Sequence, residues 1–64
     1  MDIKVELLKL GKKQVDLLEE IRKRGYPKLS FPQLSSYING RIGGPQAEKV
    51  LELSREILAD WSVN

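Results

Sequence analysis

The amino-acid sequence predicts an all-α fold, a compact bundle of four or at most five helices in one domain spanning residues 1–64. Apolar residues recur at intervals of three and four along most of the chain, which is the spacing of one helix face. No run of alternating β-branched residues predicts a strand. Four positions divide the chain into helical segments, because glycine ends helices and proline begins them: Gly11, Gly25, Gly40 and Pro45.

The first predicted helix covers residues 3–10, with Asp2 as its N-cap and Gly11 as the residue that ends it. Ile3, Leu7 and Leu10 follow one another at i, i+4 and i+7, the spacing of one helix face, and Val5 and Leu8 are adjacent to them. We assign its buried side to Ile3, Val5, Leu7, Leu8 and Leu10.

The second predicted helix covers residues 13–24 and ends before Gly25. Its N-terminus lies next to lysines, and free backbone N–H groups there favour an anion. Its last turn is basic, which suits the negative end of the helix dipole; we therefore interpret that cluster as a solvated helix end. The apolar stripe is Val15, Leu17, Leu18 and Ile21, and the basic cluster is Arg22, Lys23 and Arg24.

The third predicted helix lies between Ser30, a candidate N-cap, and Gly40, a candidate left-handed residue after its end. One face is apolar, through Leu34, Tyr37 and Ile38. The other face carries only short neutral polar residues, whereas a solvated helix face usually carries Lys and Glu. This face predicts recognition of a partner, and it consists of Gln33, Ser35, Ser36 and Asn39.

A connector with Pro27 leads into this third helix, and Leu29 is expected to turn into the core. The last helix is predicted over residues 46–61, with Gly44 as its cap and Pro45 at its start. Its apolar arc is wider than one small core needs, which suggests that part of it covers a second subunit. The predicted dimer interface is Ile57, Leu58 and Trp61, with Trp61 equally well placed to close the core of one chain.

Composition limits the classes of function. The chain has no Cys and no His, so thiolate or imidazole metal sites and imidazole catalysis are excluded. Its acids are spread singly, so we expect no enzyme, no cofactor, no metal and no small-molecule ligand. No apolar run approaches the about 20 residues of a membrane span, and the start of the chain lacks the regions of a signal peptide. We therefore expect a soluble, cytoplasmic protein.

The formal charge of +2 is unevenly distributed. Residues 1–44 hold nine basic and five acidic side chains, a net charge of +4, whereas residues 45–64 have a net charge of −2. A basic part that includes the neutral polar helix, followed by an acidic helix, is the pattern expected of a DNA-facing and a DNA-averted side.

The order of these features resembles the DNA-binding domain of the lambdoid phage repressor and Cro family. The resemblance covers roughly residues 3–60. It consists of Gln14 at the start of the second helix, Leu29-Ser30 before the third helix, Leu34-Ser35 within it and Asn39-Gly40 at its end. Lys13 replaces the usual hydroxyl cap before Gln14, and the connector between the two helices is longer than the family's tight turn.

The resemblance implies a helix-turn-helix whose third helix enters the major groove of double-stranded DNA. The implied base contacts are Phe31, Pro32, Gln33, Ser36 and Asn39. Gln pairs with adenine, Ser with several bases, and apolar side chains press on thymine methyl groups. The resemblance also implies phosphate contacts from Gln14 and from the loop after the third helix, and nearby lysines would add charge. The predicted phosphate contacts are Lys12, Lys13, Gln14, Lys28, Arg41, Gly43 and Gly44.

The expected function is a Cro- or repressor-like regulator from a phage or mobile element, which binds a pseudo-palindromic operator as a homodimer. The alternative is a protein-interaction module of the same fold, an antirepressor or inhibitor. Individual residues also have plainer interpretations. Phe31 is more often a core or helix-staple residue than a base reader, and Gln33 and Ser36 are common on surfaces.

Overall fold

Four helices account for most of residues 2–63, which are the residues described by the computed structural model. They are α1 (Ile3–Leu10), α2 (Gln14–Lys23), α3 (Phe31–Ile38) and α4 (Pro45–Ser62). No strand occurs in this part of the chain, so the predicted all-α class is confirmed, and each predicted helix exists with ends shifted by at most two residues. No helix in these residues is both long and apolar enough to cross a membrane.

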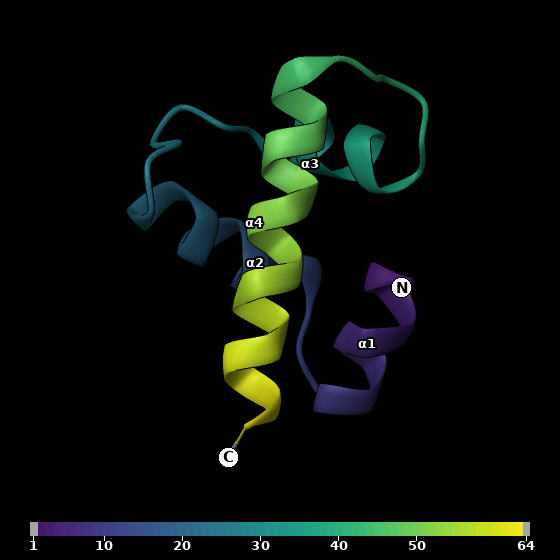
Figure 1. Ribbon diagram of the computed structural model, residues 1–64, viewed down its shortest axis with the longest axis vertical. Helices are drawn as coiled ribbons and strands as arrows, with labels where there is room; N and C mark the ends of the chain where they lie inside the picture. The colour runs from purple at the N-terminus through teal and green to yellow at the C-terminus, as the bar shows by residue number, and fades with distance from the viewer. Residues whose placement is uncertain (1, 64) are drawn as a thin grey trace.

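Helix α4 is the element on which the others assemble. Its 18 residues correspond to about 27 Å of helix, most of the 31 Å length of the molecule. Figure 1 shows α4 along the long axis, with α1 on one side, α3 near its N-terminal end and α2 passing behind it. Helices α1, α2 and α3 each pack on α4, and α2 also packs on α3.

The core draws on all four helices and on the connector before α3. Leu29 of the connector is only 3% exposed, so the prediction that it turns inward is confirmed. The largest completely buried side chains come from α2, α3 and α4. They include Leu17, Ile21, Leu34, Val50 and Ile57.

Two parts of the predicted core are wrong. In α1, Val5 is 43% and Leu8 is 80% exposed, and in α2 Val15 is 44% exposed. Helix α1 has only eight residues and uses one narrow stripe, Ile3 and Leu7, against α4. Leu8 lies about 100° around the helix from Leu7 and therefore points away from the contact.

The predicted dimer interface also needs correction. Ile57 is 0% and Leu58 is 2% exposed within a single chain, so both are core residues and cannot cover a second subunit. The wide apolar arc of α4 has a simpler cause, because three helices cover α4 from different sides. Trp61 is half-buried and packs against the same core.

The connector between α2 and α3 follows α4 toward the N-terminal end of that helix. Arg24 pairs with Asp60 near the end of α4, Tyr26 shares a crevice with Leu53, and Leu29 shares another with Gln46. Within it, the Leu29 N–H donates to the Tyr26 carbonyl (3.1 Å), which closes a turn with Pro27 in the position that favours proline. The extra length of the connector therefore brings α3 to the N-terminal half of α4.

Replacing one buried and one exposed leucine tests this packing. Leu58→Ala is expected to lower the free energy of unfolding by about 2–5 kcal/mol, because it leaves a cavity between α4 and its neighbours. Leu8→Ala serves as the matched control and is expected to change it by less than about 0.5 kcal/mol. Urea denaturation followed by circular dichroism measures both, and equal losses would contradict the assignment of these residues.

Candidate nucleic-acid interface

Helix α3 begins with a complete capping box. The Ser30 hydroxyl accepts a hydrogen bond from the Gln33 N–H (3.3 Å), and the Gln33 side-chain oxygen accepts one from the Ser30 N–H (3.4 Å). Leu29 and Leu34 occupy the staple positions on either side of the cap, and both are buried in the core. The predicted N-cap at Ser30 is confirmed.

The end of α3 also follows the prediction. Asn39 is the C-cap and Gly40 adopts a left-handed backbone with φ of 74°, a conformation that glycine accepts without steric cost. The short helix is therefore defined at both ends by its own sequence.

The outward side of α3 has an unusual composition. Phe31 is 45% exposed, so its interpretation as a core residue is wrong. Pro32 and Asn39 are exposed, and Gln33 and Ser36 are partly exposed. Phe31–Ile38 contains no charged residue, so this surface offers apolar contacts, hydroxyls and amides without a fixed charge.

The side chain of Gln33 has two competing uses. Bidentate pairing with adenine needs both the oxygen and the nitrogen of its amide. In the structure the oxygen already accepts from the Ser30 N–H, whereas the Nε2 donor forms no hydrogen bond within residues 2–63. A bidentate contact therefore requires that the oxygen accepts a second hydrogen bond or that this long bond opens.

Two cations flank α3 along the chain. Lys28 lies in the connector before it and Arg41 in the loop after it, and both are exposed. Within residues 2–63 neither forms an ion pair with a carboxylate, so both charges are available to a partner. Gly43 and Gly44 are exposed in the same loop, and a Cβ added at Gly43 would meet no atom within 4 Å.

The predicted phosphate contacts before and at the start of α2 form a separate group. Lys13 is the N-cap, and its N–H donates to the Asp16 carboxylate (2.9 Å). The Gln14 side-chain oxygen is buried without a hydrogen-bond partner in the described structure. The Lys12 ammonium lies 5.3 Å from the centre of the Trp61 ring, a cation–π contact that holds it near the C-terminal end of α4. No hydrogen bond or ion pair between described residues joins this group to α3.

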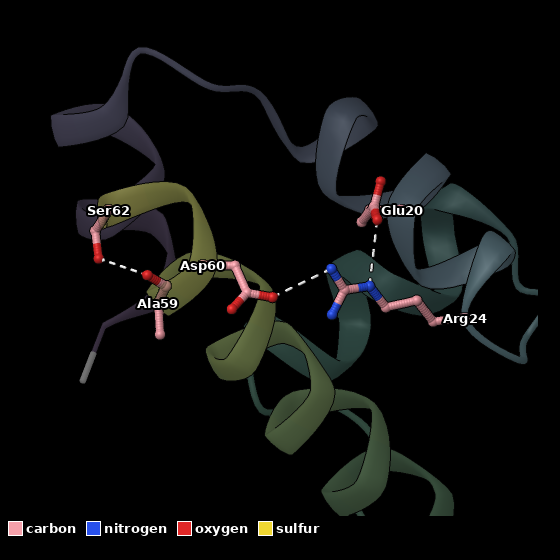
Figure 2. A network of polar contacts seen from close by, with 5 residues as sticks. All are labelled: Glu20, Arg24, Ala59, Asp60 and Ser62. Atoms are coloured by element: carbon pink, nitrogen blue, oxygen red, sulfur yellow. Dashed lines mark hydrogen bonds and ion pairs between the residues drawn. The ribbon is translucent and has the colours of Figure 1, made fainter. Parts of the chain in front are cut away.

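The basic end of α2 faces acids within the same chain. Figure 2 shows Arg24 between Glu20 and Asp60, at 3.2 and 3.3 Å, while the Ser62 hydroxyl donates to the Ala59 carbonyl close by. Desolvation opposes the charged form of Arg24, but hydrogen bonds and attraction to both carboxylates outweigh it and raise the pKa of the guanidinium. This arginine therefore links α2 to α4, and its partners make this side of the molecule unfavourable for phosphate.

An acidic row on α4 extends this unfavourable side. Its four members are exposed and follow one another at intervals of four residues: Glu48, Glu52, Glu56 and Asp60. Among the described residues, no group of three or more His, Cys, Asp or Glu is placed to hold a metal ion.

Two polar contacts around α3 were not predicted from the sequence. The Gln46 amide donates to the Tyr37 hydroxyl (3.2 Å), which joins the buried side of α3 to the start of α4. The Arg22 Nε donates to the Leu29 carbonyl (2.7 Å), while the arginine stays exposed as the sequence predicts. Neither contact has a local sequence signal, because each joins residues from different elements.

Comparison of the chain with protein-family models, with curated proteins and with solved structures gives no match.

The capping box predicts distinct effects of two substitutions. Ser30→Ala removes the acceptor for the Gln33 N–H and is expected to cost about 1 kcal/mol of stability. Gln33→Glu keeps an acceptor for the Ser30 N–H and adds a negative charge at the positive helix end, so stability is expected to be maintained. Thermal unfolding of the two variants beside the parent measures the difference, and a large loss in Gln33→Glu would argue against the cap.

Proposed function

We propose that the chain is a sequence-specific regulator that binds double-stranded DNA, with α2 and α3 as a helix-turn-helix of the lambda repressor and Cro type. The observation that carries the proposal is α3 itself. It is a short helix, capped at both ends, without charge on its outward side and flanked by Lys28 and Arg41, two cations that form no ion pair within residues 2–63. Such a surface suits base edges, while its flanks suit phosphates.

The exposed side chains of α3 match the chemistry of base recognition. Phe31 and Pro32 offer apolar surface for a thymine methyl group. The Gln33 Nε2 donates to an acceptor on a purine, and Ser36 can donate or accept. Asn39 uses its Nδ2 on the Ser35 hydroxyl (3.2 Å), which leaves its oxygen as an acceptor.

Phosphate contacts would come from both sides of α3. Arg41 and Lys28 supply charge, and Gly43 and Gly44 let the backbone approach an oxygen closely. At the start of α2, the side-chain oxygen of Gln14 is buried. The Nε2 group of the same side chain donates to no acceptor among residues 2–63. Lys12 and Lys13 add charge beside this helix end, although Lys12 must leave Trp61 to reach DNA.

Binding as a homodimer would place two copies of α3 in successive major grooves, about 34–36 Å apart, on a pseudo-palindromic site. Trp61 is the one member of the predicted interface that keeps exposed surface. Occupation of a promoter by such a dimer would exclude RNA polymerase, so repression is the proposed output, and a phage or mobile element its proposed source.

A protein-interaction module is the second candidate, and one observation favours it. Phe31 and Ile42 are 45% and 49% exposed, and exposed apolar side chains are typical of protein docking surfaces. In this alternative the chain is an antirepressor or inhibitor, and the outward side of α3 contacts a protein.

Selection of bound duplexes from a random pool tests the proposal directly. We expect a conserved half-site repeated with two-fold symmetry, and sedimentation of the selected complex should give two protomers per duplex. Affinity should fall steeply with salt, because contacts to several phosphates release counterions. Failure to bind any duplex at low salt would exclude DNA and leave the protein-interaction alternative.

Two substitutions separate base reading from phosphate binding. Gln33→Glu replaces the amide donor with a carboxylate but keeps the helix cap, so it is expected to cost about 1–3 kcal/mol on the selected site. Arg41→Ala is expected to weaken all duplexes alike and to flatten the salt dependence. Fluorescence anisotropy on selected and scrambled duplexes measures both. Equal effects on the two duplexes from Gln33→Glu would place Gln33 outside the base-reading surface.

Gly43→Ala tests the close approach of the loop backbone. A Cβ at this position meets open space and Gly43 does not have a positive φ, so the folded chain should keep its stability. Against a phosphate the added methyl would push the backbone away, and binding to all duplexes should weaken by about 1 kcal/mol, the net value of a hydrogen bond. Unchanged affinity would remove Gly43 from the interface.

A further inference from the structure

The start of α3 is tied to α2 by a hydrogen bond that spans the connector. The Arg22 Nε donates to the Leu29 carbonyl at 2.7 Å, in a partly buried position. Leu29 directly precedes the N-cap Ser30, and Arg22 lies in the last turn of α2. The contact therefore links the two helices of the proposed motif where α3 begins.

The Leu29 carbonyl depends on this arginine. No backbone N–H within residues 2–63 donates to that oxygen, and the Leu29 side chain is buried in the core. A partly buried carbonyl without a donor is unfavourable, so loss of the Arg22 bond favours a rearrangement of the peptide before α3. The orientation of that peptide sets the direction in which α3 leaves the connector.

We propose that Arg22 is a positioning residue, which fixes the direction of α3 through the Leu29 carbonyl and thereby decides which bases α3 reaches. The proposal rests on the proposed function for its effect on DNA. Its structural part concerns only the angle that α3 makes with α2 and α4.

The long connector explains why such a contact is needed. A tight turn would fix the angle between two helices by its own backbone geometry, whereas here the chain leaves α2 at Arg24 and re-enters helix at Phe31. The Tyr26 N–H donates to the Ile21 carbonyl (3.4 Å), which ties the start of the connector to α2, but no backbone hydrogen bond between described residues joins the end of the connector, at Leu29 and Ser30, to α2. Arg22 supplies this missing link from one side, and the Gln46–Tyr37 contact holds α3 from the other.

Charge provides a competing role for Arg22, and two substitutions separate the roles. In Arg22→Gln the amide nitrogen is as many bonds from Cα as the arginine Nε, so the donor is kept and the charge is lost. In Arg22→Lys the charge is kept, but a carbon atom occupies the place of Nε. A positioning role predicts that lysine is the damaging substitution, and a phosphate contact predicts that glutamine is.

The DNA experiment compares the affinity ratio between a selected and a scrambled duplex. We expect Arg22→Lys to reduce this ratio about tenfold, the value of one hydrogen bond of about 1.4 kcal/mol, with the salt dependence unchanged. Arg22→Gln should keep the ratio and lose a little affinity for both duplexes. A normal ratio in Arg22→Lys together with a flattened salt dependence in Arg22→Gln would overturn the proposal and make Arg22 a phosphate contact.

A measurement without DNA keeps the two proposals distinguishable. Residual dipolar couplings of the α3 amides, referred to those of α2 and α4, report the angle that α3 makes with these helices. We expect this angle to change in Arg22→Lys and to match the parent in Arg22→Gln, with both variants folded by circular dichroism because neither touches the core. An unchanged angle in Arg22→Lys overturns the positioning role, whether or not the parent binds a duplex.

Discussion

The burial of α4 on several sides at once is the constraint on which the rest of the structure depends. A chain of 64 residues has a small core, and a single long helix fills its centre while three short segments cover it. Ile57 and Leu58 are buried in this packing, so little apolar surface of α4 remains exposed for a partner. The short helices in turn gain most of their stability from contact with α4, because isolated helices of eight to ten residues are marginal.

The same constraint determines where α3 lies and what it presents. The connector follows α4 from the side of Asp60 toward Gln46, and α3 packs against the N-terminal half of α4 through Leu34 and Tyr37. The side chains on the outward side of α3 do not pack in the core, and among them Gln33 contributes to the helix cap. Acids gather along α4, and one of them, Asp60, pairs with Arg24 at the end of α2, whereas Lys28 and Arg41 stay unpaired beside α3 within the described chain.

Sequence patterns predicted local features well and contacts between elements poorly. The caps at Asp2, Ser30 and Gly44 are confirmed because each depends on a few neighbouring residues. Leu8 was misassigned because periodicity cannot tell how many sides of a short helix are covered. Leu58 was misassigned for the opposite reason, since a wide apolar arc looks the same whether it faces three helices of one chain or a second subunit. Arg22 is exposed, as the sequence predicts, but its hydrogen bond to the Leu29 carbonyl has no signal in the sequence, because any residue type supplies a backbone carbonyl.

The capping box of α3 has a consequence for how such a surface can diverge. Gln33 serves the fold with its oxygen and offers its nitrogen to a partner, so most replacements at this position alter stability and recognition together. Ser36 lies on the same side of α3 and forms no hydrogen bond through its side chain within residues 2–63. A replacement there can therefore change recognition without removing a contact of the fold. Under the proposed function, a lineage acquiring a new target sequence would change first at Ser36, and position 33 would alternate between Gln and Glu as long as the cap is retained.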